Sequence, residues 1–240
     1  MSLRTPLARR ELGPLLLLVL LAGGIWGFLA LAGEIREGDT NRADRALMLA
    51  LRERGNLADP LGPPWVEEAA RSITALGSTV VLALLTLSVA GFLVLDHKAR
   101  LALLLVLAVG GGIATGFLLK EAFRRPRPML VPHAVRVVTT SFPSAHSMSS
   151  AATYLTLGAF LARVQKRRRL KVYLLGLAIF LTLIVGLTRV YLGVHWPTDV
   201  LAGWTAGGCW ALLCWNIAIW LQRRGEVERE SGDEAAAETR

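Results

Sequence analysis

The sequence predicts an all-α membrane protein, a polytopic bundle of six transmembrane helices with both termini in the cytoplasm. Of its 240 residues 53% are hydrophobic and only 19% are charged, and the mean hydropathy is +0.48. The net charge is nevertheless +9, a combination typical of apolar spans with basic flanks. This composition excludes disorder over most of the chain and does not fit a free-standing nucleic-acid binder. The two cysteines lie in one apolar run, which excludes a disulfide scaffold.

Six apolar stretches define the expected spans. A bilayer core needs about 20 apolar residues in a helix. The strict alternation of barrel strands is absent, so helices are favoured over strands. In chain order the stretches are residues 15–33, 77–95, 101–119, 148–162, 172–187 and 200–221. The first stretch follows three arginines like a signal peptide, but its length favours an uncleaved anchor.

Basic residues predict the orientation of these helices. They collect before the first stretch, between the second and third, between the fourth and fifth, and after the sixth, which places these segments in the cytoplasm. Residues 166–169 are the densest cluster, and contact with anionic membrane lipid is expected there rather than nucleic-acid binding. Residues 1–224 are predicted to form one membrane domain. Residues 225–240, with six acidic residues and two basic ones, are predicted to be a disordered cytoplasmic tail.

Two outer segments need separate interpretation. Residues 41–54 mix apolar residues with arginines, which fits an outer interfacial helix and a solvated connector equally well. Residues 120–127 are basic although they are expected outside, against the positive-inside rule. Of the charged residues near them, Arg124, Arg125 and Arg136 are interpreted as interfacial side chains that extend to water, and Glu121 as an ion-pair partner of Lys120. Trp196 could shape the site, but a position in the interfacial aromatic belt is favoured.

Three polar clusters stand at the expected outer ends of the helices. The third and fifth spans end on the outer side and the fourth and sixth begin there, so all three clusters are expected to meet at one membrane face. They comprise Lys120 with Arg127 and Pro128; residues 141–146; and Thr188 and Arg189 with His195 and Asp199.

The cations and the helix start in these clusters suit a tetrahedral dianion. Lys120, Arg127 and Arg189 offer many donors, and arginine binds phosphate oxygens bidentately. Ser144 is a good helix N-cap, and the free N–H groups of the helix that follows form an anion site.

The remaining polar residues suit proton transfer and nucleophilic attack. His146 and His195 titrate near neutral pH, as nucleophile or general acid. Asp199 is spaced to accept from the far nitrogen of His195 and to fix its tautomer. Neither a carboxylate cluster for magnesium nor a cysteine–histidine set for zinc occurs in the sequence. The pattern therefore predicts metal-free phosphoryl transfer through histidine, without a cofactor.

These motifs resemble those of a known family. Lys120-x6-Arg127-Pro128, Pro143-Ser144-Ala145-His146 and Thr188-Arg189-x5-His195-x3-Asp199 resemble the three signature motifs of the type 2 phosphatidic acid phosphatases, the lipid phosphate phosphatases related to vanadium haloperoxidases. The resemblance covers roughly residues 75–221. It implies hydrolysis of a phosphomonoester or diphosphate on a lipid, of the undecaprenyl diphosphate, phosphatidylglycerol phosphate or phosphatidic acid class. The short, arginine-rich chain suggests a prokaryotic inner membrane, with the site on the periplasmic side.

The resemblance also implies roles for individual residues. His195 attacks phosphorus and becomes a phosphohistidine, Asp199 orients it, and His146 protonates the leaving oxygen and then helps to activate water. The residues implied to bind the phosphoryl oxygens are Lys120, Arg127, Ser144, Ala145 and Arg189. Ala145 stands where the family commonly has glycine, and Thr188 where it commonly has serine. Neither change removes a catalytic group, so an active enzyme is expected unless position 145 requires a positive φ.

Two other functions fit parts of this pattern. A lipid or anion transporter would use the basic cluster as a substrate site, but would have no need of the His195–Asp199 pair. A vanadate-dependent peroxidase shares the phosphate pocket, but those relatives are soluble and lack the six spans. The identity of the lipid and the oligomeric state are left open by the sequence.

Overall fold

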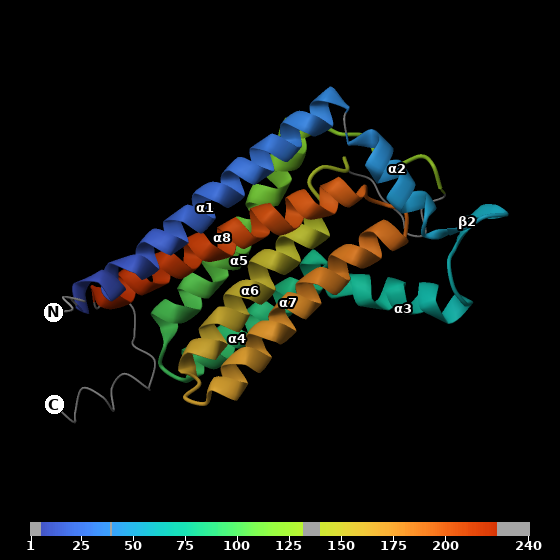
Figure 1. The fold of residues 1–240 in the computed structure, drawn as a ribbon. Helices are drawn as coiled ribbons and strands as arrows, with labels where there is room; N and C mark the ends of the chain where they lie inside the picture. The colour runs from blue at the N-terminus through green and yellow to red at the C-terminus, as the bar shows by residue number, and fades with distance from the viewer. Residues whose placement is uncertain (1–5, 39, 132–139, 225–240) are drawn as a thin grey trace.

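The computed structural model describes residues 6–38, 40–131 and 140–224, and in this part of the chain it is a bundle of long helices with a small outer connector (Figure 1). The helices are α1 (Pro6–Glu37), α2 (Asn41–Leu49), α3 (Pro64–Ala75), α4 (Thr79–Leu95), α5 (Ala99–Phe123), α6 (Ala145–Val164), α7 (Arg168–Tyr191) and α8 (Pro197–Arg223), and the strands are β1 (Arg52–Glu53) and β2 (Asn56–Pro60). The predicted disordered tail, residues 225–240, lies outside the described residues.

Four of the described helices are long and apolar enough to cross a membrane. They are Leu15–Glu37 within α1, all of α5, all of α7, and Pro197–Gln222 within α8. α3 and α4, which meet at a bend of 49°, add a fifth span if they cross together. The chain is therefore an integral membrane protein with four or five candidate spans, and the number six and the cytoplasmic termini stay predictions.

α6 is the predicted span that does not meet this measure, because it is rich in serine and threonine. It packs against α5, α7 and α8 at the centre of the bundle, so its side chains face other helices. Two of its hydroxyl groups bond within the helix: Ser150 Oγ donates to the Ser147 carbonyl at 3.1 Å and Thr156 Oγ1 to the Ala152 carbonyl at 2.6 Å, whereas Thr153 Oγ1 is buried without a partner. Polar residues with internal partners are tolerated in such a position, which explains why a central helix has a weak apolar signal.

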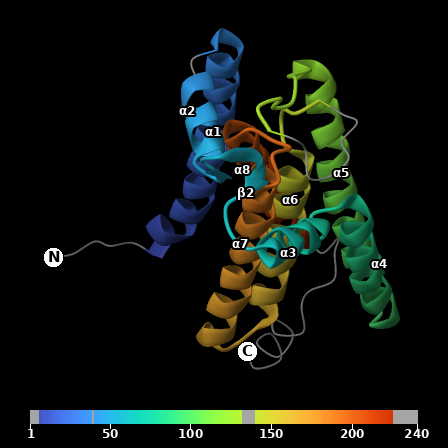
Figure 2. The same ribbon diagram turned by 90° about the vertical axis from the view of Figure 1, so that its right-hand side faces the viewer.

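The connector between α1 and α4 covers one end of the bundle, and it includes residues 41–54, for which the sequence fits an interfacial helix and a solvated connector equally well. Figure 1 and Figure 2 show α2, β2 and α3 together at this end of the bundle. α2 packs on α8 and buries Met48 in a cluster with Val131, Val190 and Val200. It is therefore a docked helix with a buried face. β1 and β2 form a short antiparallel pair that the all-α prediction did not include.

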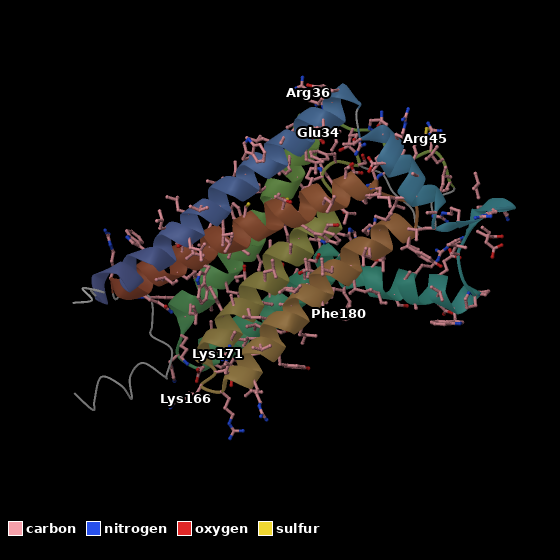
Figure 3. All side chains as sticks on the ribbon, in the orientation of Figure 1. Glu34, Arg36, Arg45, Lys166, Lys171 and Phe180 are labelled. Carbon is pink, nitrogen blue, oxygen red and sulfur yellow. The ribbon has the colours of Figure 1, made fainter. Side chains whose placement is uncertain are left out.

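The two ends of the bundle differ in their charged residues. Lys166 and Lys171, beside the turn between α6 and α7, lie at the end opposite Glu34, Arg36 and Arg45 (Figure 3). The densest basic cluster, residues 166–169, and the connector thus lie at opposite ends of the helices.

Close packing of α6 against α8 depends on glycine. A Cβ atom on Gly207 would lie 2.7 Å from the Ala151 Cβ atom, and closer still to the Met148 carbonyl oxygen. A Cβ atom on the adjacent Gly208 would meet nothing within 4 Å. The two helices approach each other most tightly along the face that carries Gly207, which fixes the N-terminal half of α6 relative to α8.

The first prediction compares these neighbouring glycines. We expect Gly207→Ala to destabilise the bundle by about 1–3 kcal/mol, because the backbone of α6 would have to move. The measurement is the apparent melting temperature of the purified protein in detergent. Gly208→Ala is the matched control and should melt as the wild type does. Equal melting temperatures for the two variants would contradict this account of the α6–α8 contact.

Candidate active site

The structure brings the three polar clusters together at the connector end of the bundle. Arg127, in the segment after α5, places Nη1 3.1 Å from His195 Nε2 in the turn between α7 and α8. His195 Nδ1 lies 3.4 Å from Asp199 Oδ2 in the first turn of α8. His146, at the start of α6, interacts electrostatically with Arg189, His195, Arg127 and Lys120. Residues up to about eighty positions apart in the sequence thus form one site.

The start of α6 is organised by Ser144. Its side chain is the N-cap, accepting from Ser147 N at 3.4 Å and from Ser147 Oγ at 2.9 Å. Its backbone N–H donates to the carbonyl oxygen of Asp199 at 3.0 Å, which ties the start of α6 to the start of α8. The N-terminus of α6 therefore lies at the site, and a helix N-terminus favours an anion.

Ala145 is the first residue of α6, and it answers a question left by the sequence. Among the described residues only His97 and Arg124 combine a side chain with a positive φ. Position 145 is therefore in ordinary helical conformation and does not require glycine. Thr188, the other departure from the family pattern, uses its hydroxyl to donate to the Val185 carbonyl at 2.6 Å.

Two further cations are buried beside the histidines. Lys120, in the last turn of α5, donates from Nζ to the Thr140 carbonyl at 2.5 Å. Arg189, in the last turn of α7, donates from Nη1 to Thr74 Oγ1 at 3.0 Å, while its Nε has no hydrogen-bond partner. A buried guanidinium with donors to spare is costly unless a ligand supplies an acceptor. The arrangement of donors fits an oxyanion.

The geometry around His195 defines its tautomer. An arginine can only donate, so Arg127 Nη1 beside Nε2 requires that nitrogen to be unprotonated. The ring proton then resides on Nδ1, which faces Asp199 Oδ2 at 3.4 Å without forming a hydrogen bond to it. Burial, aided by the positive charges of Arg127, Arg189 and Lys120, holds the pKa of His195 well below its ordinary value. The imidazole is therefore neutral, with the lone pair of Nε2 directed at the cations.

Asp199 is completely buried and held from several sides. Its Oδ1 accepts from Arg125 Nη1 at 2.7 Å, and its Oδ2 accepts from the Trp196 backbone N–H at 2.9 Å. Trp196 itself is the N-cap of α8. Its indole N–H donates to the Pro126 carbonyl at 3.3 Å, and its ring lies 5.4 Å from the Arg125 guanidinium. Trp196 thus packs against the site, the role that the sequence favoured less than a position in the aromatic belt.

The charged residues next to the motifs were partly misassigned by the sequence. Arg125 was expected to extend to the interface, but its side chain is only 9% exposed and is paired with two carboxylates. Glu121 was expected to pair with Lys120, but its Oε2 lies 3.4 Å from Arg124 Nη2 instead. Arg124 is 76% exposed, as expected of an interfacial arginine. Arg136 lies outside the described residues.

The donor set of the site favours oxyanion chemistry. Within residues 6–38, 40–131 and 140–224, no group of three or more histidine, cysteine or acidic side chains could hold a metal ion. The groups that do converge are cations, helix N–H groups and a neutral histidine backed by a carboxylate. Such a site can bind a phosphoryl group and attack it.

Comparison with known proteins identifies the class of this membrane protein. Residues 100–223 match the model of the PAP2 superfamily. Phosphatidylglycerophosphatase B of Bacillus subtilis is 33% identical over 184 residues, which cover 75% of this chain and 85% of that protein. Decaprenylphosphoryl-5-phosphoribose phosphatase of Mycobacterium tuberculosis is 30% identical over 169 residues, covering 69% of this chain and 85% of that one.

A solved structure agrees with these relatives. The crystal structure of a PAP2 type phosphatidylglycerolphosphate phosphatase from Bacillus subtilis superimposes with a TM-score of 0.76 at 30% identity, covering 85% of this chain and 98% of that chain. The fold and the relatives together define a membrane-embedded phosphoric ester hydrolase. The chain belongs to the PAP2 superfamily.

The second prediction concerns Ala145. We expect Ala145→Gly to leave kcat/KM for lipid phosphate within about twofold, because the N–H group and the helical dihedral angles are already present; glycine would weaken the helix start by no more than about 1 kcal/mol. Steady-state phosphate release by the two proteins in detergent checks this. A gain of tenfold or more on introducing glycine would show that the alanine side chain obstructs the phosphate site.

Proposed function

We propose that this protein hydrolyses a phosphomonoester or diphosphate on a lipid through a phosphohistidine intermediate on His195, without a metal ion. The observation that supports it most directly is the orientation of His195. Its Nε2 lone pair faces Arg127, and its Nδ1–H faces the buried Asp199 carboxylate. The Nε2 lone pair faces a cation that can bind phosphate, and the other ring nitrogen faces a carboxylate. A histidine in this arrangement is suited to attack a bound phosphoryl group.

The phosphoryl group would be held by the cations and by the start of α6. Arg127, Arg189 and Lys120 donate to its oxygens, as do Ser144 and the Ala145 and His146 backbone N–H groups. Burial strengthens these charge-assisted hydrogen bonds, because the local dielectric is low. The spare Nε donor of Arg189 supports this role.

Hydrolysis then takes two steps. In the first, His195 Nε2 forms a bond to phosphorus while the bond between phosphorus and the leaving oxygen breaks, and His146, protonated in the complex with the anionic substrate, gives its proton to that oxygen. In the second, a water molecule gives a proton to His146 and adds to phosphorus, and the phosphorus–nitrogen bond breaks. Inorganic phosphate leaves, and both histidines return to their starting states. Asp199 stabilises the positive charge on the His195 ring in the intermediate.

A lipid substrate is supported by an apolar cavity of about 440 Å³ between α1, α5, α6 and α8. The cavity reaches Met148, one helical turn beyond Ser144, and it includes Phe28, whose ring lies 5.7 Å from that of Phe142. A cavity with this lining suits a hydrocarbon chain whose phosphate lies at the start of α6. The named relatives act on phosphatidylglycerophosphate and on decaprenylphosphoryl-5-phosphoribose. We therefore infer an anionic phospholipid or isoprenoid phosphate as the substrate class.

The location proposed for this reaction is a prokaryotic inner membrane, with the site on the periplasmic side. The basic turn between α6 and α7 lies at the end opposite the connector (Figure 3), and such clusters remain in the cytoplasm.

The third prediction tests the nucleophile and the absence of a metal. With dioctanoyl phosphatidic acid in detergent and EDTA present, we expect the wild type to release phosphate at an undiminished rate. His195→Asn should lower kcat by about 1,000-fold or more, because no other side chain replaces the nucleophile. His97→Asn is the matched control, since His97 is exposed in the turn between α4 and α5. Loss of wild-type activity in EDTA, or full activity of His195→Asn, would contradict the mechanism.

The fourth prediction tests the orientation. Met129, in the segment after α5, is 93% exposed. We expect a cysteine at position 129 to react with an impermeant thiol reagent added to spheroplasts, and one at position 166 to react only after lysis. The wild type, which retains Cys209 and Cys214 in α8, gives the background. The reverse pattern of labelling would place the site in the cytoplasm.

A further inference from the structure

A buried network of charges contacts Asp199 through Oδ1, the carboxylate oxygen that does not face His195. Arg125 bridges two carboxylates: Nη1 lies 2.7 Å from Asp199 Oδ1, and Nη2 lies 2.9 Å from Asp44 Oδ2. The Arg125 Nη1 also donates to Thr198 Oγ1 at 2.9 Å. Both carboxylates are at most 1% exposed. Both carboxylates are buried and Arg125 is only 9% exposed, so the three charges depend on one another for neutralisation.

Arg125 is anchored at its backbone as well as at its guanidinium. Its carbonyl oxygen accepts from the Ser141 N–H at 2.8 Å and from Ser141 Oγ at 3.2 Å. The Trp196 ring lies 5.4 Å from the guanidinium carbon and covers it. The fork of Arg125 is thereby fixed between the start of α8 and the connector.

Asp44 belongs to α2, outside the part of the chain that matches the PAP2 superfamily model. Its Oδ1 accepts from the Thr198 N–H at 3.0 Å, and its Oδ2 accepts from Thr198 Oγ1 at 2.6 Å. Both oxygens are thus engaged by Arg125 and by the first turn of α8. A buried carboxylate is costly unless it is paired in this way. The burial of Asp44 therefore joins the connector to the residues around Asp199.

The consequence for Asp199 concerns the direction of its carboxylate. Arg125 engages Oδ1 and the Trp196 N–H engages Oδ2, so the carboxylate plane has one orientation. In that orientation Oδ2 is the atom that faces His195 Nδ1, at 3.4 Å. Without Arg125, Asp199 would lose its ion pair and become free to rotate or to take up a proton. Either change would remove the carboxylate that faces the His195 Nδ1–H at 3.4 Å.

Asp44 has a distinct effect, because it shares Arg125 with Asp199. Arg125 contributes one positive charge and the two carboxylates two negative charges, so the group keeps one net negative charge next to His195. The His195 ring becomes positive when its nitrogen bonds to phosphorus. Without the Asp44 charge, Arg125 would neutralise Asp199 and weaken its support for that positive ring.

We propose that Arg125 and Asp44 are positioning residues, which set the orientation and the net charge of the Asp199–His195 pair from behind. This inference rests on the phosphohistidine mechanism proposed above. It assigns a role to α2: the connector contributes a charge to the active centre as well as covering one end of the bundle.

The test compares variants of the full chain with closely matched controls. Arg125→Gln and Asp44→Asn remove one charge each, and their double variant removes both. Arg124→Gln is the control for arginine, since the adjacent Arg124 is 76% exposed. Asp59→Asn is the control for aspartate, since Asp59 is exposed in the same connector. All are purified in detergent, and kcat, KM, inhibition by inorganic phosphate and melting temperature are measured with dioctanoyl phosphatidic acid.

We expect kcat to fall on the order of 10- to 100-fold in Arg125→Gln and in Asp44→Asn, because the reacting histidine is held less well. KM and the inhibition constant for phosphate should stay within about threefold, because Lys120, Arg127 and Arg189 still bind the anion. The double variant should lose no more activity than the worse single variant, since both act through one network. Arg125→Lys, which keeps the charge, should recover part of the lost kcat.

Two results would overturn the proposal. One is an unchanged kcat in Arg125→Gln when the wild type is active and His195→Asn is not, which would leave the proposed function intact. The other is a loss of activity that matches the loss of folded protein, so that kcat per phosphate-binding site is the same as in the wild type. A wild type no more active than His195→Asn would overturn the proposed function and this inference together.

Discussion

The arrangement of the site depends on one buried carboxylate, that of Asp199. Its side chain meets Arg125, the Trp196 N–H and His195, and its carbonyl oxygen accepts from the Ser144 N–H at 3.0 Å. The end of α5, the start of α6, the turn before α8 and, through Arg125, the connector helix α2 all converge on this residue. A carboxylate without solvent must have such partners, so the requirement to pair Asp199 determines how these segments meet.

The same requirement relates the bundle to the chemistry. Small residues such as Gly207 allow α6 to approach α8 closely, and that approach brings the Ser144 cap to the Asp199 carbonyl. The start of α6 then lies beside the start of α8, which carries Asp199. An oxyanion site of this kind is preorganised, because its donors are fixed before a substrate enters. The hydroxyl-rich centre of α6 is compatible with the membrane because neighbouring helices surround it.

The helices and the clustered motif residues could be predicted from the sequence, since hydropathy and residue spacing depend on local pattern. Each predicted apolar stretch lies largely within a helix, and the end of α5 meets the start of α6, the end of α7 and the start of α8 at one end of the bundle, as their order along the chain requires. Arg125 and Asp44 could not be recognised, because a single arginine or aspartate in an amphipathic segment is usually exposed. Their pairing joins positions 81 residues apart. The one available signal was the segment 120–127, which is more basic than the positive-inside rule predicts for a segment expected outside. The weak span signal of α6 and the β1–β2 pair likewise reflect tertiary surroundings.

The most direct test of the account is detection of the covalent intermediate. The wild type is mixed with a lipid phosphate labelled on phosphorus, quenched in alkali within one turnover, and analysed by mass spectrometry of its peptides. The account predicts a phosphoryl group on His195 that is stable in alkali and lost in acid, and a stronger signal in His146→Ala if hydrolysis of the intermediate is slowed more than its formation. Label on another residue, or turnover with no labelled protein at any quench time, would contradict a phosphohistidine mechanism.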